Sequence, residues 1–173
     1  MNAADERHIA LVGLSGSGKS TLAPVLASRL GAHHVVDLDK VVEARFGASV
    51  ADVFRTRGEA VFRDAEADAL ATALSGPPAV IATGGGVVLD AENRRALVSE
   101  AFVVWLRAHP DHLDERLSGP TEARPLLEGD RAFALARLSE ERAALYGAVA
   151  DLVIDVEGID PTDLALEVVR ALA

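Results

Sequence analysis

Residues 13–21 read GLSGSGKST and directly follow an apolar run, IALV, at residues 9–12. An apolar strand, a tight loop with glycines at both ends and a Lys-Ser-Thr that opens a helix form the pattern G-x-x-x-x-G-K-[ST] in the setting of a phosphate-binding loop. The backbone N–H groups of such a loop converge on one concavity, and the following helix adds its positive dipole end. The stretch therefore predicts a polyphosphate site, with a glycine-rich turn that binds nothing as the alternative.

The chemistry of each residue type assigns roles within this loop. Lys19 is expected to reach the β- and γ-phosphates of a nucleotide, and the hydroxyl of Ser20 is expected to bind Mg²⁺. The predicted nucleotide-binding residues of the loop are Gly16, Ser17, Gly18, Lys19, Ser20 and Thr21. Nothing in this stretch indicates which molecule receives the phosphate.

The composition is that of one soluble domain, residues 1–173, in which half of the residues are hydrophobic and can form a substantial core. Lys and Arg number 17 against 27 Asp and Glu, so the formal net charge is −10. This charge repels a nucleic-acid backbone or an anionic membrane, and we expect neither as a partner. An anionic ligand would have to be bound locally, by placed arginines and backbone dipoles.

The location is expected to be cytoplasmic. The chain has no cysteine, which excludes disulfides and thiolate metal sites. Residues 1–7 are polar and acidic rather than basic and then apolar, and no stretch approaches the length that spans a bilayer.

Apolar runs alternate with helical patterns along the chain. Strands are expected at residues 8–12, 33–37, 79–83, 102–106 and 152–156. Helices are expected at residues 19–30, 39–46, 49–74 with a break at Gly58, 90–100, 110–117, 130–147 and 161–173. This alternation predicts the α/β class, with a parallel sheet covered by helices on both faces.

Ligands of open parallel sheets sit beyond the carboxyl ends of the strands, so the residues at those ends are candidates for the site. The second expected strand ends at Asp37 and Asp39, whose spacing places both carboxylates on one side of an extended segment. Asp37 is expected to hold Mg²⁺ directly or through water, and Asp39 to meet an acceptor hydroxyl. The alternative is that Asp39 caps the next helix and Asp37 is solvated.

The third expected strand ends in three consecutive glycines, Gly84, Gly85 and Gly86. Without a Cβ, their backbone can approach a ligand closely and offer N–H donors to an anion. A flexible turn is the alternative, but the position at a strand's carboxyl end favours a role in the site.

Two arginines have the sequence surroundings of surface residues. Arg63 follows Glu59 by four residues and precedes Glu66 by three, which is typical of an exposed helical ion pair. Arg142 also lies on a charged helix, where its neighbours favour a solvated position.

A further arginine, Arg124, lies in the long loop 118–129, whose length is typical of a lid. An arginine there could close over transferring phosphates as an electrostatic clamp. Arg107, Arg116 and Arg131 lie near the same loop, and local sequence does not rank them.

Taken together, these residues resemble the shikimate kinase family along nearly the whole chain. The matching motifs are GLSGSGKST at 13–21, DxD at 37–39, GExxFR at 58–63 with Glu66, IATGGG at 81–86, RPLL at 124–127 and ERxxLY at 141–146. The phosphate loop is widespread among nucleotide-binding proteins, whereas the ordered set is specific. The resemblance implies a three-layer α/β/α fold of the nucleoside-monophosphate-kinase type, with five parallel strands in the order 2-3-1-4-5.

The resemblance also implies an activity: transfer of the γ-phosphoryl group of ATP to the 3-hydroxyl of shikimate, with Mg²⁺, on the route to chorismate and the aromatic amino acids. By the same resemblance, Asp39 would bind the ring hydroxyls of shikimate. Arg63 and Arg142 would bind its carboxylate together with backbone N–H groups of residues 84–86, Gly85 in particular.

On the nucleotide side, the resemblance implies that Lys19, Mg²⁺ and Arg124 neutralise the charge of the transferring group. Arg116 is the candidate for contact with adenine.

Two alternatives remain at this point. Gluconate kinases and adenylylsulfate kinases share the phosphate loop but do not require two carboxylate-binding arginines at a glycine turn. A regulatory nucleotide-binding subunit with an inactive acceptor site is disfavoured by Lys19, Asp37, Asp39 and Arg124. The protein is expected to be a monomer.

Overall fold

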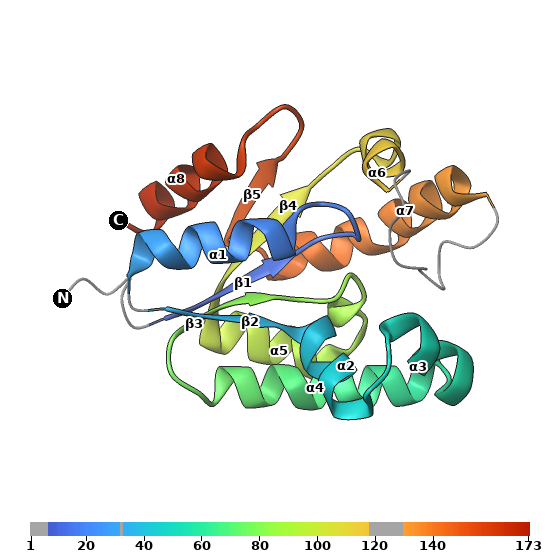
Figure 1. Ribbon diagram of the computed structural model, residues 1–173. Coiled ribbons are helices and arrows are strands. Elements are labelled where there is room, and N and C mark those ends of the chain that lie inside the picture. The colour runs from blue at the N-terminus through green and yellow to red at the C-terminus, as the bar shows by residue number, and fades with distance from the viewer. Residues whose placement is uncertain (1–6, 32, 118–129) are drawn as a thin grey trace.

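The computed structural model describes residues 7–31, 33–117 and 130–173. Its centre is one parallel sheet whose strands lie in the order β2-β3-β1-β4-β5 (Figure 1). The strands are β1 (His8–Val12), β2 (His34–Asp37), β3 (Ala79–Ala82), β4 (Ala101–Arg107) and β5 (Leu152–Asp155). The strand order implied by the family resemblance is therefore confirmed.

Helices cover both faces of this sheet. They are α1 (Lys19–Leu30), α2 (Leu38–Phe46), α3 (Val50–Arg57), α4 (Glu59–Leu74), α5 (Ala91–Glu100), α6 (Pro110–Arg116), α7 (Arg131–Val149) and α8 (Pro161–Leu172). Figure 1 shows α1 and α8 on one face and α4 and α5 on the other. No helix within the described ranges is long and apolar enough to cross a membrane.

Strand β1 shows how the sequence builds the layers. Every residue of the strand is buried, because helices cover it on both sides. Ile9 and Leu11 pack into the core beneath α1 and α8, whereas Ala10 and Val12 point to the opposite core beneath α4, α5 and α7. Strand β1 thus supports the phosphate loop, which follows its carboxyl end. In open parallel sheets, ligands bind beyond this end of the strands.

Helix α7 differs from the expected element, since it runs through Gly147 to Val149 instead of ending at the glycine. Tyr146 and Val149 on either side are buried in the core. Their packing outweighs the cost of about 1 kcal/mol for a glycine inside a helix. The predicted break at Gly58 is confirmed, because this residue has φ 86° and separates α3 from α4.

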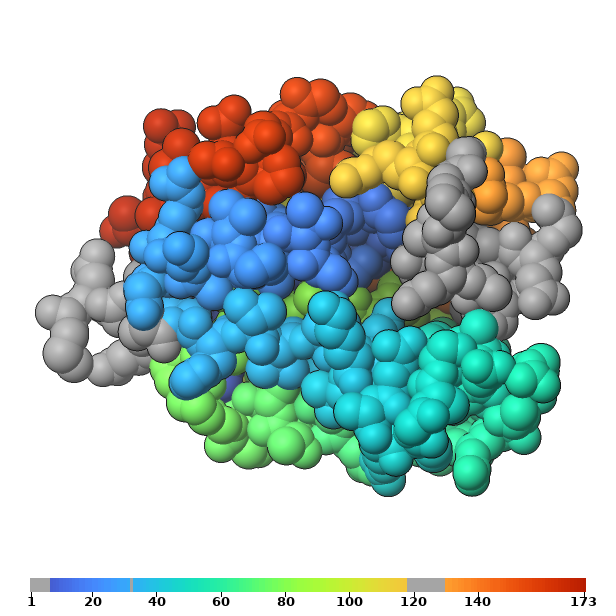
Figure 2. All heavy atoms as spheres, viewed as in Figure 1, coloured from blue at the N-terminus to red at the C-terminus, as the bar shows by residue number. Residues whose placement is uncertain are grey.

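Helices α2 and α3 lie on one side of the molecule, below α1 in the view of Figure 2. Ser49 begins α3 as the predicted cap: its Oγ accepts a hydrogen bond from Asp52 N at 3.1 Å. Helices α2 and α3 form one wall of the site described below.

Candidate active site

The carboxyl ends of the strands open onto a cavity of about 560 Å³. Its walls come from the phosphate loop, α2, α3, α4, the glycine turn after β3, and α7. The predicted site residues that line it are Ser20, Asp37, Asp39, Arg63, Gly84, Gly85, Gly86 and Arg142. Segments far apart in the sequence therefore meet in one place. The predicted loop 118–129 and its Arg124 lie outside the described residues.

The phosphate loop needs glycine at several points. Gly13, Gly16 and Gly18 have φ of 141°, 86° and 98°, where other residues are strained. A Cβ on Gly13 would also lie 2.5 Å from the carbonyl oxygen of Leu106. Gly18 is the N-cap of α1, so the loop leads directly to the positive end of that helix.

Lys19 is buried within the loop that it follows. Its Nζ donates to the carbonyl oxygens of Gly13 at 2.7 Å and Leu14 at 2.8 Å. The ammonium group is thus held at the concavity of the loop by backbone oxygens.

Asp37, the last residue of β2, and Asp39 do not share an extended segment, so this part of the prediction is wrong. Helix α2 begins at Leu38, immediately after Asp37, which is its N-cap and accepts a hydrogen bond from Lys40 N at 3.3 Å. Asp39 lies in the first helical turn. The cap is therefore Asp37 rather than Asp39, because the chain turns into the helix one residue earlier than expected. Both aspartates nevertheless line the cavity.

The donor atoms near the loop suit a hard cation. The Ser20 hydroxyl and the Asp37 carboxylate line the same cavity, and oxygen ligands of this kind with several waters are what Mg²⁺ prefers. The capping bond engages one oxygen of Asp37 and leaves the other oxygen for a cation.

The glycine turn is approached closely by charged side chains of α4. A Cβ on Gly84 would lie 2.0 Å from Glu66 Oε1, and one on Gly86 would lie 2.3 Å from Arg63 Nη1. The missing side chains thus make room for the protein's own charged groups, whereas sequence reasoning expected room for a ligand. A freely flexible turn does not fit this close packing.

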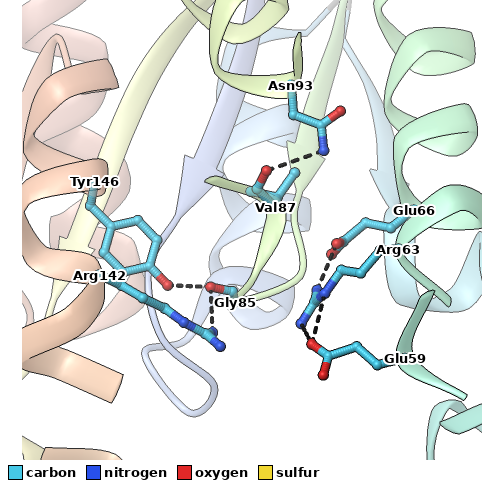
Figure 3. Close-up of polar contacts among 8 residues, drawn as sticks. All are labelled: Glu59, Arg63, Glu66, Gly85, Val87, Asn93, Arg142 and Tyr146. Carbon is cyan, nitrogen blue, oxygen red and sulfur yellow. Dashed lines mark hydrogen bonds and ion pairs between the residues drawn. The ribbon is translucent and has the colours of Figure 1, made fainter. Parts of the chain in front are cut away.

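Arg63 makes both ion pairs that its spacing predicts, but at the cavity wall (Figure 3). Its Nη1 lies 2.7 Å from Glu66 Oε2 and its Nη2 lies 3.2 Å from Glu59 Oε1. The Glu66 side chain is only 1% exposed. Burial raises the pKa of Glu66, and the nearby Arg63 opposes that rise. The pair is therefore part of a buried cluster instead of a solvated surface pair.

Arg142 is buried, so its interpretation as a surface residue is wrong. Its Nη1 donates to the carbonyl oxygen of Gly85 at 2.9 Å (Figure 3). Its Nε is buried and has no hydrogen-bond partner among the described residues. A buried arginine with unused donors at a cavity can bind an anion.

Sequence reasoning gave no site role to Glu66 or Tyr146. Tyr146 donates its hydroxyl hydrogen bond to the same Gly85 oxygen as Arg142 (Figure 3). A signal for the burial of Tyr146 was present on α7, because Leu138, Arg142 and Tyr146 follow one another at four-residue spacing on one face.

The remaining arginines occupy different places. Arg116 lies over the phosphate loop, with its Nη1 3.6 Å from the point where a Cβ on Gly18 would stand. Arg107 pairs with Asp155 at 2.6 Å, and Arg131 pairs with Asp114 at 2.6 Å. Of the three, Arg116 is the one that the structure places against the nucleotide loop.

The sheet order, the phosphate loop and the adjoining cavity are those of a P-loop nucleotide-binding fold, the class to which ATP-dependent small-molecule kinases belong. The family model described as shikimate kinase matches residues 15–173. The chain belongs to the shikimate kinase family.

Individual relatives agree with this assignment. The chain is 43% identical over 167 residues to shikimate kinase of Symbiobacterium thermophilum, with 95% of each chain covered. Among solved structures, shikimate kinase from Acinetobacter baumannii in complex with shikimate superposes with a TM-score of 0.91 at 32% identity, covering 95% of this chain and 92% of that one. A gluconokinase from Sinorhizobium meliloti is 18% identical with a TM-score of 0.59, covering 96% and 91% of the two chains, and shares the fold alone.

Proposed function

We propose that the protein transfers the γ-phosphoryl group of ATP to the 3-hydroxyl of shikimate, yielding shikimate 3-phosphate and ADP. One observation carries the proposal: two arginines distant in sequence, Arg63 and Arg142, meet at the Gly84–Gly86 turn in a cavity beside the phosphate loop. The similar structure from Acinetobacter baumannii, which is in complex with shikimate, supports it.

The donor half of the site is the phosphate loop. Its backbone N–H groups and the N-terminus of α1 bind the phosphates of ATP. Phosphate oxygens then replace the carbonyls of Gly13 and Leu14 as partners of the Lys19 ammonium. Ser20 and Asp37 would hold Mg²⁺, which would neutralise charge on the β- and γ-phosphates.

The acceptor half binds shikimate by its carboxylate and hydroxyls. Arg63 and Arg142 form charge-assisted hydrogen bonds with the carboxylate, each worth about 1.5–3 kcal/mol, and the N–H groups of the glycine turn add further donors. Asp39 accepts hydrogen bonds from the ring hydroxyls and aligns the 3-hydroxyl with the γ-phosphorus. Bonds of this strength allow a protein with a net charge of −10 to bind an anion.

The chemical step depends chiefly on placement. Phosphoryl transfer passes through a loose transition state, so alignment and charge neutralisation matter more than a strong base. Asp39 therefore acts by orienting the hydroxyl and accepting its proton late in the transfer. We assign Arg124 to charge neutralisation from the family resemblance. We assign Arg116 to nucleotide binding from the same resemblance and from its place over Gly18.

A coupled assay of ADP release, with shikimate, gluconate and adenylylsulfate compared side by side, tests the proposal. Turnover with shikimate alone is expected. Turnover with gluconate or adenylylsulfate and none with shikimate would replace the proposed acceptor, and no turnover with any of them would favour an inactive nucleotide-binding subunit.

We also propose that the protein is a monomeric, single-domain cytoplasmic enzyme without nucleic-acid or membrane partners. The net charge of −10 supports the absence of such polyanionic partners. Light scattering coupled to size exclusion measures the oligomeric state.

A further inference from the structure

Tyr146 is buried behind the glycine turn and does not line the cavity. Its ring packs against Trp105 with 5.5 Å between ring centroids. Its hydroxyl nevertheless reaches past the core and donates to the carbonyl oxygen of Gly85, which also accepts from Arg142 Nη1 (Figure 3). One carbonyl is therefore held by two donors from the same face of α7.

Because a peptide unit is planar, the two hydrogen bonds that hold the Gly85 carbonyl oxygen also orient the N–H on the opposite side of the same peptide. In a trans peptide the carbonyl oxygen of Gly85 and the N–H of Gly86 point in opposite directions, and no peptide bond described here is cis. Two donors that fix the oxygen therefore also fix the N–H. Among the described residues, the Gly86 N–H has no hydrogen-bond acceptor, although its residue lines the cavity.

The same contact sets the orientation of Arg142. Because Nη1 is engaged by Gly85, the edge of the guanidinium that carries Nε remains for a ligand, and Nε is buried without a partner among the described residues. Two parallel donors on that edge match the two oxygens of a carboxylate. Burial raises the pKa of Tyr146 to about 12, so its hydroxyl stays protonated and can donate to the Gly85 oxygen.

We propose that Tyr146 is a positioning residue for the acceptor: by holding the Gly85 carbonyl together with Arg142, it presents the Gly86 N–H and the Nε edge of Arg142 to the carboxylate of the substrate. This inference rests on the proposed function, because it concerns the same acceptor site. The ring of Tyr146 contributes to the core, whereas the hydroxyl contributes to substrate binding.

The variant Tyr146→Phe separates these two contributions, since it keeps the ring and removes the hydroxyl. The KM for shikimate is expected to rise by roughly 3- to 10-fold, the range for loss of one neutral hydrogen bond, while kcat and the KM for ATP stay within about 2-fold. The matched control is Val149→Ala, which removes buried atoms from the same helix one turn later without touching Gly85. The control is expected to lower the melting temperature and leave the KM for shikimate unchanged.

A second measurement leaves the fold unaltered. Tyr146 is the only tyrosine of the chain, so biosynthetic 3-fluorotyrosine gives a single ¹⁹F resonance at this site. Saturating shikimate is expected to shift that resonance, and ADP alone is expected to leave it in place.

Four results would count against the inference, and they are distinguishable. Unchanged shikimate kinetics in Tyr146→Phe, or a fluorine resonance that ignores shikimate, would overturn the role of the hydroxyl while the proposed function stands. An equal rise in KM in Val149→Ala would assign the effect to helix packing instead. Absence of shikimate turnover by the unmodified protein would overturn the proposed function and this inference with it.

Discussion

The donor and acceptor halves of the site are built by opposite means. The donor half is one contiguous stretch, residues 13–21, in which backbone groups and glycine conformations supply the binding surface. The acceptor half draws on α2, α4, the turn after β3, and α7, and charged side chains supply its surface. Its parts hold one another in place through Glu66, Arg63 and the carbonyl of Gly85.

This difference predicts which substitutions each half of the site tolerates. The donor half depends on a few backbone torsion angles and on the strand beneath it, so removal of the Lys19 side chain should leave the glycine conformations of the loop in place. A site of mutually supporting side chains depends on each partner, so one substitution alters both binding and packing. The two halves should therefore respond differently to substitution.

The largest effect is expected from Lys19→Ala. Loss of the ammonium removes charge neutralisation at the transferring group, so kcat should fall by roughly 10²- to 10³-fold. Because Lys19 belongs to the phosphate loop, where its Nζ donates to the carbonyl oxygens of Gly13 and Leu14, calorimetry should give an unchanged dissociation constant for shikimate. A variant that retains turnover would remove the phosphate-loop assignment, and weakened shikimate binding would show that the two halves are not separate.

Arg63→Ala should weaken binding of shikimate and leave binding of ATP intact, the reverse of the pattern expected for Lys19→Ala. The KM for shikimate is expected to rise by roughly 10- to 150-fold, equivalent to one charge-assisted hydrogen bond, with the KM for ATP nearly unchanged. Steady-state kinetics with each substrate varied in turn provides the measurement.

The control for Arg63 is Arg45→Ala, which breaks an exposed ion pair with Asp68 between α2 and α4. Exposed pairs contribute little, so the KM for shikimate should not change. If both variants behave alike, the carboxylate of the substrate is bound elsewhere.

Gly84→Ala tests whether close packing explains the glycine turn. A Cβ at this position would stand 2.0 Å from Glu66 Oε1, so the variant should lose about 1–3 kcal/mol of unfolding free energy from overpacking. Gly147→Ala is the matched control, because its Cβ would meet Trp105 at an ordinary 3.8 Å inside a helix. That change should be neutral or stabilising. Equal chemical denaturation curves for the two variants would refute the packing explanation.

The smallest effect concerns the pH dependence of stability. Burial raises the pKa of Glu66 above its ordinary value of 4.5, so the folded protein binds this proton more tightly than the unfolded chain. The resulting stabilisation is complete below pH 4.5 and is lost as the pH rises through the folded-state pKa. In Glu66→Gln this decline should be absent, so denaturant unfolding above pH 4.5 should show a shallower fall of stability than in the unmodified protein. Parallel curves would show that Glu66 titrates normally.

The donor half could be predicted from sequence because its determinants are local. The glycines, the lysine and the preceding apolar strand stand within residues 9–21, and each has one physical reason to be there. The strand order is different, since alternation of strands and helices predicts a parallel sheet without ordering it. That order came from the resemblance of the whole motif set.

The acceptor half could be predicted only in part because its determinants are distant in sequence. Arg142 is buried and donates a hydrogen bond to the carbonyl oxygen of Gly85, 57 residues away, and no local spacing reveals that partner. Glu66 is buried because Gly84 has no side chain. The capping role of Asp37 was missed because a strand and a helix meet there without a loop between them.

A crystal structure with shikimate and ADP bound would test the division into two halves most directly. The expected result is ADP on residues 13–21 and the shikimate carboxylate within hydrogen-bond distance of Arg63, Arg142 and the glycine turn, with the 3-hydroxyl beside Asp39. A shikimate molecule whose carboxylate contacts neither arginine, or that lies outside the cavity, would contradict it.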